Sequence, residues 1–330
     1  MLRLSSLGDV VLTLPVVHAL ARAYPEADVH YWVKEEYAAL VRFDPAIRHV
    51  RELERDASRI EDLVSMSAEL EDCDLIVDLH GSARSRLLTF RQGARVLRVR
   101  ARRLQRERWV RARWTRPAPL PHATARYAEV VAPLGVVPEG FPRVHTSAAA
   151  EAWAHDAVTA LADGARCVAL CPGARHATKR WPEERWCELD ARLAELGVAR
   201  AVFSTAAEQR GLPRLAAQVA SGKAARWFTE PLERTTALLG ECAVAVTHDS
   251  GLMHLAAARG VRVVAIFGST SPVLGFAPSG EGHAVLCRDL ACQPCTLHGR
   301  ERCPLGHFRC MTEIEVQEVL SRTRERLPAP

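Results

Sequence analysis

Residues 248–257 read HDSGLMHLAA and place a carboxylate, a hydroxyl, a glycine and an imidazole between two apolar runs. The segment is typical of a helix start, where free backbone N–H groups and the helix dipole attract an anion such as phosphate. Ser250 can cap this helix, Gly251 lets a ligand approach the backbone, and His254 lies one turn later on the same face. The spacing predicts an anion site, although a simple cap at Ser250 and a core histidine at His254 would give the same pattern.

Three further polar segments carry groups that can act on a ligand. In CPGARHATKRWP (171–182), Lys179 and Arg180 precede a predicted helix start, where the helix dipole disfavours cations unless an anion is shared. In STAAEQ (204–209), Glu208 follows a predicted strand, where an acid commonly binds ribose hydroxyls. The last segment is SSLGDV (5–10). A solvated pair of cations and a surface glutamate are the alternative interpretations.

Hydrophobic periodicity indicates the elements that position these groups. The predicted strands are 2–6, 28–33, 74–79, 166–173, 200–205, 225–229, 243–247 and 261–268. The predicted helices are 10–24, 123–135, 182–197, 206–220, 232–242 and 250–260, with a linker over 136–150. This alternation predicts an α/β fold with two Rossmann-like, doubly wound parallel-sheet domains, 1–145 and 146–330. Ligands then bind at the carboxyl ends of the strands, in an interdomain cleft, and all four polar segments lie at strand ends.

Composition excludes several classes of protein. Hydrophobic residues make up 48% and charged residues 25% of the 330 residues, as in soluble globular proteins. The longest run without a charge, 263–280, contains glycines and prolines that prevent a membrane-spanning helix. No GxGxxG follows the first predicted strand and no GxxxxGKS/T occurs, which disfavours dinucleotide dehydrogenases and P-loop enzymes.

Together, SSLGDVVLTLP, CPGARHATKRWP, STAAEQ and THDSGLMHLAA resemble the signature segments of glycosyltransferase family 9. This is the ADP-heptose:lipopolysaccharide heptosyltransferase family, and the chain looks most like its heptosyltransferase II type. The resemblance spans nearly the whole chain in order. It implies a GT-B fold and an inverting glycosyltransferase that moves a heptose from ADP-heptose to the inner core of lipopolysaccharide, on a lipid A–Kdo acceptor. It implies no cofactor for catalysis.

The resemblance also implies roles for individual residues. Asp9 matches the family's general base, and Ser6 and Gly8 are assigned with it to acceptor binding. The donor-binding residues are Thr178 and Lys179 at the phosphates, Glu208 at the ribose, and Asp249, Ser250, Gly251 and His254 at the diphosphate and heptose. Asp9 lies near a helix start, which should lower its pKa and weaken it as a base unless the site is desolvated. A helix cap is the alternative role for Asp9.

The segment 84–116 contains thirteen arginines and a single acid, Glu107. Within the resemblance it belongs to the domain that binds an acidic, phosphorylated glycolipid, and arginine forks suit phosphate. Arg84, Arg102 and Arg103 are therefore predicted acceptor ligands, with Trp109 and Trp114 at the lipid interface. The protein would be cytoplasmic and peripheral at the inner membrane. A solvated basic helix or nucleic-acid binding are the alternatives, and no nucleic-acid partner is expected.

Ten cysteines are present, and five of them, at 73, 167, 171, 187 and 242, are scattered in mostly apolar surroundings that suggest reduced thiols in the cytosol. The other five lie in the tail 287–310. There Cys292, Cys295, Cys303 and Cys310 suit a structural zinc site, although the second pair is spaced wider than usual. Disulfides and free thiols are the alternatives.

Three other functions fit parts of the pattern. A family relative could use another nucleotide sugar or glycan acceptor, and a nucleotide-sugar epimerase can share the same architecture. A non-catalytic protein that binds anionic lipid or nucleic acid would use the basic segment alone. An enzyme needs Asp9, Lys179 and His254, whereas a binding protein does not.

Overall fold

The computed structural model describes residues 1–54, 67–68, 70, 72–90, 92–100, 102–111 and 118–328. The chain divides into two compact units. The first comprises Met1–Arg103 and Pro121–Thr146, and the second comprises Leu104–Leu120 and Ser147–Pro330. The stretch Leu104–Leu120 thus groups with the second unit, which the sequence did not predict. Its anchors include a hydrogen bond from the Leu120 backbone N–H to the Val273 carbonyl (2.9 Å).

The first unit has parallel strands in two pairs that the N-terminal residues join. The strands are β1 (His30–Lys34), β2 (His49–Leu53), β3 (Leu75–Asp78) and β4 (Arg95–Arg98), with β1 beside β2 and β3 beside β4. Leu2 forms bridges to Trp32 of β1 and to Asp78 of β3, so the chain start runs between the two pairs. The predicted strand 2–6 is therefore shorter than expected.

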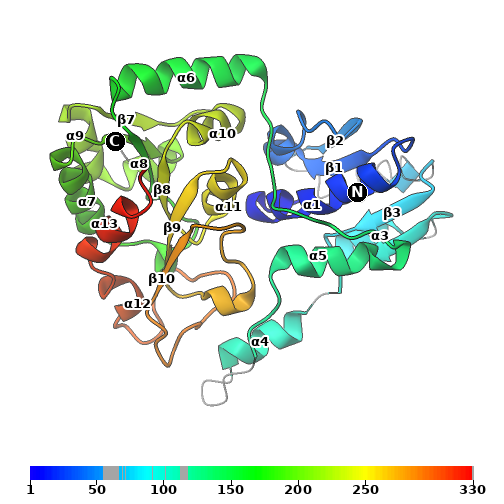
Figure 1. Ribbon diagram of the computed structural model, residues 1–330. Coiled ribbons are helices and arrows are strands. Elements are labelled where there is room, and N and C mark those ends of the chain that lie inside the picture. Colours follow the sequence, from blue (N-terminus) through cyan, green and yellow to red (C-terminus); the bar gives the residue numbers. More distant parts are fainter. Residues whose placement is uncertain are drawn as a thin grey trace. The chain divides into compact units, whose positions relative to one another are not determined.

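Helices of the first unit carry the polar segments that follow its strands. They are α1 (Leu7–Ala23), η1 (Glu35–Leu40), α3 (Ala83–Leu88), α5 (Ala123–Val131) and η2 (Ala132–Leu134), and α1 packs against α5 (Figure 1). Most of α1 is buried, including Val10, Leu14 and Val17. Because residues 10–17 are buried without interruption, packing on nearly every side of α1 stabilises it more than helix propensity does.

The second unit contains one six-stranded parallel sheet in the order β10-β9-β8-β5-β6-β7 (Figure 1). Its strands are β5 (Cys167–Cys171), β6 (Ala199–Phe203), β7 (Ala225–Phe228), β8 (Val244–His248), β9 (Arg262–Phe267) and β10 (Ala284–Cys287). Strand order reverses between β5 and β8, as in the doubly wound nucleotide-binding folds. Ligands in such folds bind at this switch point, beyond the carboxyl ends of the strands.

Two groups of helices accompany this sheet. One comprises α7 (Glu183–Glu195), α9 (Pro213–Ser221) and α13 (Val316–Arg324), and the other α6 (Ala148–Ala162), α10 (Leu232–Gly240) and α11 (Gly251–Ala258). Shorter elements are η3 (Ala177–Lys179), α8 (Ala206–Arg210), η4 (Pro272–Leu274) and α12 (Arg309–Thr312). All of α4 (Arg103–Arg111) except its first residue lies within the stretch Leu104–Leu120 that groups with this unit. All five residues of β5 and of β8 are buried, as expected for central strands covered on both faces.

Several predicted boundaries differ from the structure; the helix expected over 206–220, for example, is divided into α8 and α9. The linker expected over 136–150 ends early, because Ser147 caps α6 through its side chain and Ala148 begins the helix. The helix was not predicted, since its alanine-rich sequence shows little contrast between faces. Within the described residues, no helix has both the length and the apolar composition needed to span a bilayer.

Candidate functional site

Two loops meet at the switch point of the second unit. The loop after β5 carries Lys179, and the turn after β8 carries Asp249. Their side chains form an ion pair, with Lys179 Nζ 2.7 Å from Asp249 Oδ2 and with 14% and 12% of each side chain exposed. Thr270, which follows β9, donates a hydrogen bond to the same carboxylate oxygen (2.6 Å). Two residues predicted to hold the donor are thus close together at the expected end of the sheet.

The start of α11 has the geometry of an anion site. Ser250 is its N-cap, in extended conformation, yet its side chain makes no capping hydrogen bond. Its Oγ atom is buried and has no hydrogen-bond partner among the residues that the structure describes. Because the first N–H groups of a helix lack partners within the helix, a ligand oxygen can satisfy both these groups and the hydroxyl. Gly251 begins the helix, and His254 is buried on it.

His248 is a structural residue of this site that the sequence analysis missed. Its Nε2 accepts a hydrogen bond from the Trp181 backbone N–H (2.8 Å), and its Nδ1 lies 3.3 Å from the Gly173 carbonyl oxygen. Burial, together with the cations of Lys179 and Arg180, lowers the pKa of His248 to about 4. A neutral imidazole thus ties both ends of the Lys179 loop to β8. No signal in the sequence pairs residues this far apart.

Glu208 lies beside the same loop. It forms a capping box at the start of α8, where its Oε2 accepts hydrogen bonds from the N–H (2.9 Å) and the hydroxyl (3.0 Å) of Thr205. A side chain at position 173 would overlap the Glu208 carboxylate, so Gly173 lets the carboxylate lie against the loop backbone. The role predicted for Glu208, binding the ribose of the donor, stays a prediction.

Asp9 is the centre of a polar cluster in the first unit. Arg3 Nη2 lies 2.8 Å from its Oδ2, and the Tyr127 hydroxyl donates a hydrogen bond to its Oδ1 (2.9 Å). Ser6 Oγ donates to Oδ2 (3.0 Å). Burial, and then the charge of Asp9, raise the pKa of Tyr127, so the phenol stays protonated and remains the donor. Arg3 and Tyr127 were missed, since neither carries a recognisable signal.

The other predicted acceptor residues come from α1, from α3 and from the start of α4. Gly8 is buried within α1, and Arg84 is half-buried on α3. Arg102 Nη2 donates to both carboxylate oxygens of Glu129 (2.9 Å each). Arg103 begins α4, and its side chain lies outside the described part of the structure.

The two tryptophans of the basic segment do not support the predicted lipid contact. Trp109 is buried, with 8% exposed, and its Nε1 donates to the Ala118 carbonyl (3.1 Å), so its prediction as an interface residue is wrong. Trp114 lies outside the described residues.

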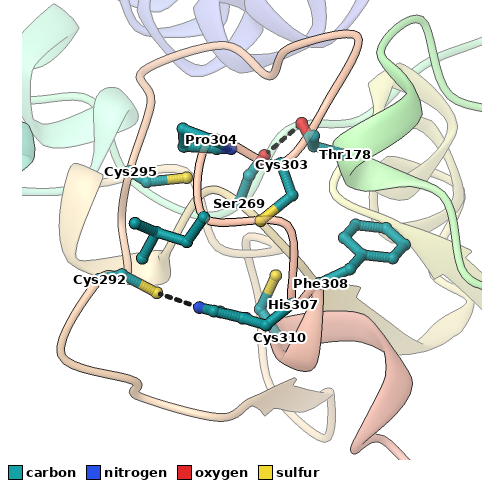
Figure 2. A pocket seen from close by; sticks show the side chains of 10 residues that line it. Thr178, Ser269, Cys292, Cys295, Cys303, Pro304, His307, Phe308 and Cys310 are labelled. Atoms are coloured by element: carbon teal, nitrogen blue, oxygen red, sulfur yellow. Dashed lines mark hydrogen bonds between the residues drawn. The ribbon is translucent and has the colours of Figure 1, made fainter.

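The four predicted metal ligands line one small pocket, together with His307, Thr178 and Ser269 (Figure 2). Cys292 Sγ lies 3.7 Å from His307 Nε2. All ten cysteines of the protein are free thiols in the structure. Within the described part of the chain, no group of three or more Cys, His, Asp or Glu side chains could hold a metal ion as it stands.

Fold and site together define an α/β protein with a doubly wound sheet, at whose switch point a lysine lies near an uncapped helix start. The chain belongs to glycosyltransferase family 9 (heptosyltransferase), whose family model matches residues 64–305. It is therefore a glycosyltransferase, and the resemblance seen in the sequence is confirmed.

Named relatives agree in length and fold. Lipopolysaccharide heptosyltransferase 1 of Pseudomonas aeruginosa is 28% identical over 98% of this chain and 93% of its own. A family 9 glycosyltransferase from Veillonella parvula has a TM-score of 0.80 at 20% identity, covering 98% of this chain and 95% of that one. ADP-heptose lps heptosyltransferase II of E. coli has a TM-score of 0.75 at 19% identity, covering 98% and 96%. The predicted GT-B fold is thereby confirmed.

Proposed function

We propose that the protein transfers a heptose from ADP-heptose to the inner core of lipopolysaccharide, with inversion at the anomeric carbon. The observation that carries the donor half is the Lys179–Asp249 pair beside the uncapped start of α11. A diphosphate there would meet an ammonium group, free backbone N–H groups and the Ser250 hydroxyl. The names of the relatives, heptosyltransferases that include one named for ADP-heptose, support the choice of sugar and nucleotide.

In the proposed reaction, Asp9 accepts the proton of an acceptor hydroxyl. The oxygen attacks the anomeric carbon of the heptose while the bond from that carbon to ADP breaks. Lys179 and the start of α11 stabilise the charge that develops on the departing diphosphate, which is the role that fixed donors play in transfer reactions. Glu208 holds the ribose, while His254 and Asp249 orient the diphosphate and heptose. The proposed acceptor-binding residues are Ser6, Gly8, Arg84, Arg102 and Arg103.

The proposal is tested by adding ADP, UDP, GDP or NAD and measuring thermal unfolding. A ligand at about 100 times its Kd adds roughly 2.7 kcal/mol of stability, which a melting curve resolves. We expect only ADP to stabilise the protein against thermal unfolding. We then expect the protein to transfer heptose from ADP-heptose to a lipid A–Kdo acceptor that carries no heptose. A larger effect of UDP or GDP would assign another nucleotide sugar. No effect of any nucleotide would favour a non-catalytic anion-binding protein.

The finer proposal is that the protein works peripherally at the inner face of the cytoplasmic membrane. It is supported by exposed apolar side chains within the basic segment, Leu87 with 54% and Phe90 with 64% exposed, beside the exposed Arg86. Such a mixture suits an anionic lipid surface. Sedimentation with anionic lipid vesicles is the measurement, and equal binding by the Leu87→Ser, Phe90→Ser double variant would contradict this contact.

We also propose one structural metal ion, preferably zinc, at Cys292, Cys295, Cys303 and Cys310. All four line one pocket, and their sulfur atoms must move closer together to share one ion. Slight burial raises the pKa of Cys303, yet backbone N–H groups of residues 305–308 lower it by more, which favours the thiolate that a metal needs.

Elemental analysis of the purified protein tests the metal. We expect about one zinc or iron ion per chain, lost in Cys292→Ser and kept in Cys187→Ser, which alters a cysteine outside the tail. Less than about 0.2 ion per chain, with all thiols reacting as free, would reject the site.

A further inference from the structure

Residues 287–310, called here the cysteine lobe, lie directly against the loop that carries Lys179. The contact runs through Thr178, the residue before the lysine, which is 2% exposed. Its backbone N–H donates to the Arg300 carbonyl (3.0 Å), and its Oγ1 accepts from the Arg300 N–H (2.8 Å). The Thr178 hydroxyl therefore faces the lobe, where it is held by protein groups.

A second contact brings the two backbones still closer. Gly299 has a φ of +112°, and a Cβ at this position would lie 2.5 Å from the His176 Cβ. Glu301 Oε1 lies 3.5 Å from His176 Nδ1. The lobe thus follows the loop from His176 to Thr178, and only a residue without a side chain fits at the point of closest approach.

The lobe is itself fixed to the turn that follows β9. Cys295 N–H donates to the Ser269 carbonyl (3.0 Å), and the Gln293 side-chain amide donates to the Thr270 carbonyl (3.1 Å). Ser269 also holds Thr178 directly, through its N–H to the Thr178 carbonyl (3.2 Å) and between the two hydroxyl oxygens (2.9 Å; Figure 2). Thr270 is the residue that binds the Asp249 carboxylate. One turn therefore positions both partners of the Lys179–Asp249 pair.

We propose that the cysteine lobe is a brace for the donor site, and that Thr178 is the positioning residue through which it sets Lys179 relative to the start of α11. This inference rests on the proposed donor role of Lys179. Thr178 then serves the diphosphate indirectly: its hydroxyl orders the loop, and the lysine meets the phosphate. The role differs from the direct donor contact that the sequence predicts for Thr178.

The experiment compares Thr178→Val, which removes the hydroxyl, with Thr178→Ser, which keeps it. We expect Thr178→Val to weaken ADP binding, measured by titration calorimetry, by about tenfold or more, and Thr178→Ser to stay within about threefold of wild type. The KM for the donor should rise with ADP Kd while the KM for the acceptor stays unchanged. A general loss of structure would instead lower the active fraction and leave both KM values as they are.

A double-mutant cycle tests whether Thr178 affects ADP binding through Lys179. If Thr178 acts through Lys179, then Thr178→Val added to Lys179→Ala should weaken ADP binding by no more than Lys179→Ala alone. Additive effects would overturn the positioning role. Wild type that binds no ADP would reject the proposed function itself, whereas wild-type and Thr178→Val proteins that bind ADP equally would reject only the brace.

Two glycines of the lobe can be compared to test its contact with the loop. Gly299→Ala and Gly306→Ala both place a side chain at positive φ, but a Cβ at Gly306 meets no atom within 4 Å. Gly299→Ala carries the greater backbone strain, because its φ of +112° lies farther from the left-handed helical region than the +71° of Gly306. It alone also pushes against His176. We expect weaker ADP binding in Gly299→Ala alone. Equal ADP affinity of the two variants would contradict a brace.

Discussion

At the scale of single residues, the Asp9 carboxylate, which we propose as the general base, is held by neighbouring side chains. Its contacts with Arg3 and Tyr127 hold both carboxylate oxygens in place. In the proposed reaction, the acceptor hydroxyl takes the place of one of these partners at Asp9.

Asp9→Asn removes the proposed base but keeps a hydrogen-bond acceptor for the polar cluster. Asparagine keeps an oxygen for the Tyr127 hydroxyl but cannot accept the proton, so kcat should fall about 100-fold or more. ADP affinity should stay unchanged, because the proposed nucleotide ligands belong to the other unit. Steady-state rates and calorimetric ADP titrations measure both quantities.

The control for lost charge is Asp78→Asn. Asp78 is buried and lies 2.7 Å from Arg98, so its substitution also leaves an arginine without its carboxylate. We expect Asp78→Asn to lose stability while the folded protein keeps its turnover. Turnover of Asp9→Asn within about threefold of wild type would show that Asp9 serves as a helix-start residue and not as the base.

These residues also show which parts of the site could be predicted from the sequence. Asp9, Lys179 and Asp249 could be chosen because each follows a strand within a recognisable segment. Tyr127 and Thr270 could not, since each contacts its partner only after the chain has folded back from a distant position. His248 lies inside the quoted segment, yet its burial as the last residue of β8 becomes visible only in the structure.

At the scale of elements, the start of α11 differs from an ordinary helix start. Ser147 caps α6 by accepting from the Ala150 N–H (3.2 Å), whereas the Ser250 hydroxyl makes no such bond. A capping serine commonly adds about 1 kcal/mol to stability. The hydroxyl of Ser250 is thus buried at a cost in the ligand-free protein, and a bound phosphate oxygen would remove that cost.

Ser250→Ala should therefore weaken ADP binding by about tenfold without lowering the stability of the free protein. Ser147→Ala is the matched comparison, because it removes a formed cap: it should cost about 1 kcal/mol and leave ADP affinity unchanged. Denaturant unfolding and ADP titration of both variants provide the readout. The opposite pattern, a stability loss in Ser250→Ala with normal ADP binding, would make Ser250 a simple cap.

Most elements near the site were predictable because their apolar periodicity is strong. Examples are the central strands β5 and β8 and the amphipathic helix α7, whose buried face includes Trp186 and Leu189. α6 and the grouping of Leu104–Leu120 with the second unit were not. The former has an alanine-rich face with little contrast, and the latter depends on contacts distant in sequence.

At the scale of the whole molecule, each unit contains a histidine that folding keeps neutral. Burial, and then the cation of Arg3, lower the pKa of His80 in the first unit to about 4. Burial likewise lowers the pKa of His248 in the second unit to about 4. Both histidines regain their ordinary pKa of about 6.5 when the chain unfolds. Acid therefore favours the unfolded state of both units.

The direction in which stability changes with pH follows from proton binding. Between pH 6.5 and 4 the unfolded chain binds protons at these histidines and the folded chain does not, so stability falls as the pH falls through this window. Above pH 6.5 the stability contribution is fully present. For the fully buried His248, a shift from 6.5 to about 4 corresponds to about 3 kcal/mol over the window.

Denaturant unfolding at pH 7, 6 and 5 should show this loss in the wild type and a smaller loss in His248→Gln. Glutamine can still accept from the Trp181 N–H and donate to the Gly173 carbonyl, but it does not titrate. His145→Gln, at an exposed position, is the comparison. If His248→Gln loses stability with acid as steeply as the wild type does, His248 is not the titrating group. If it has normal stability but weak ADP binding at pH 7, the imidazole positions the Lys179 loop in a way that an amide cannot replace.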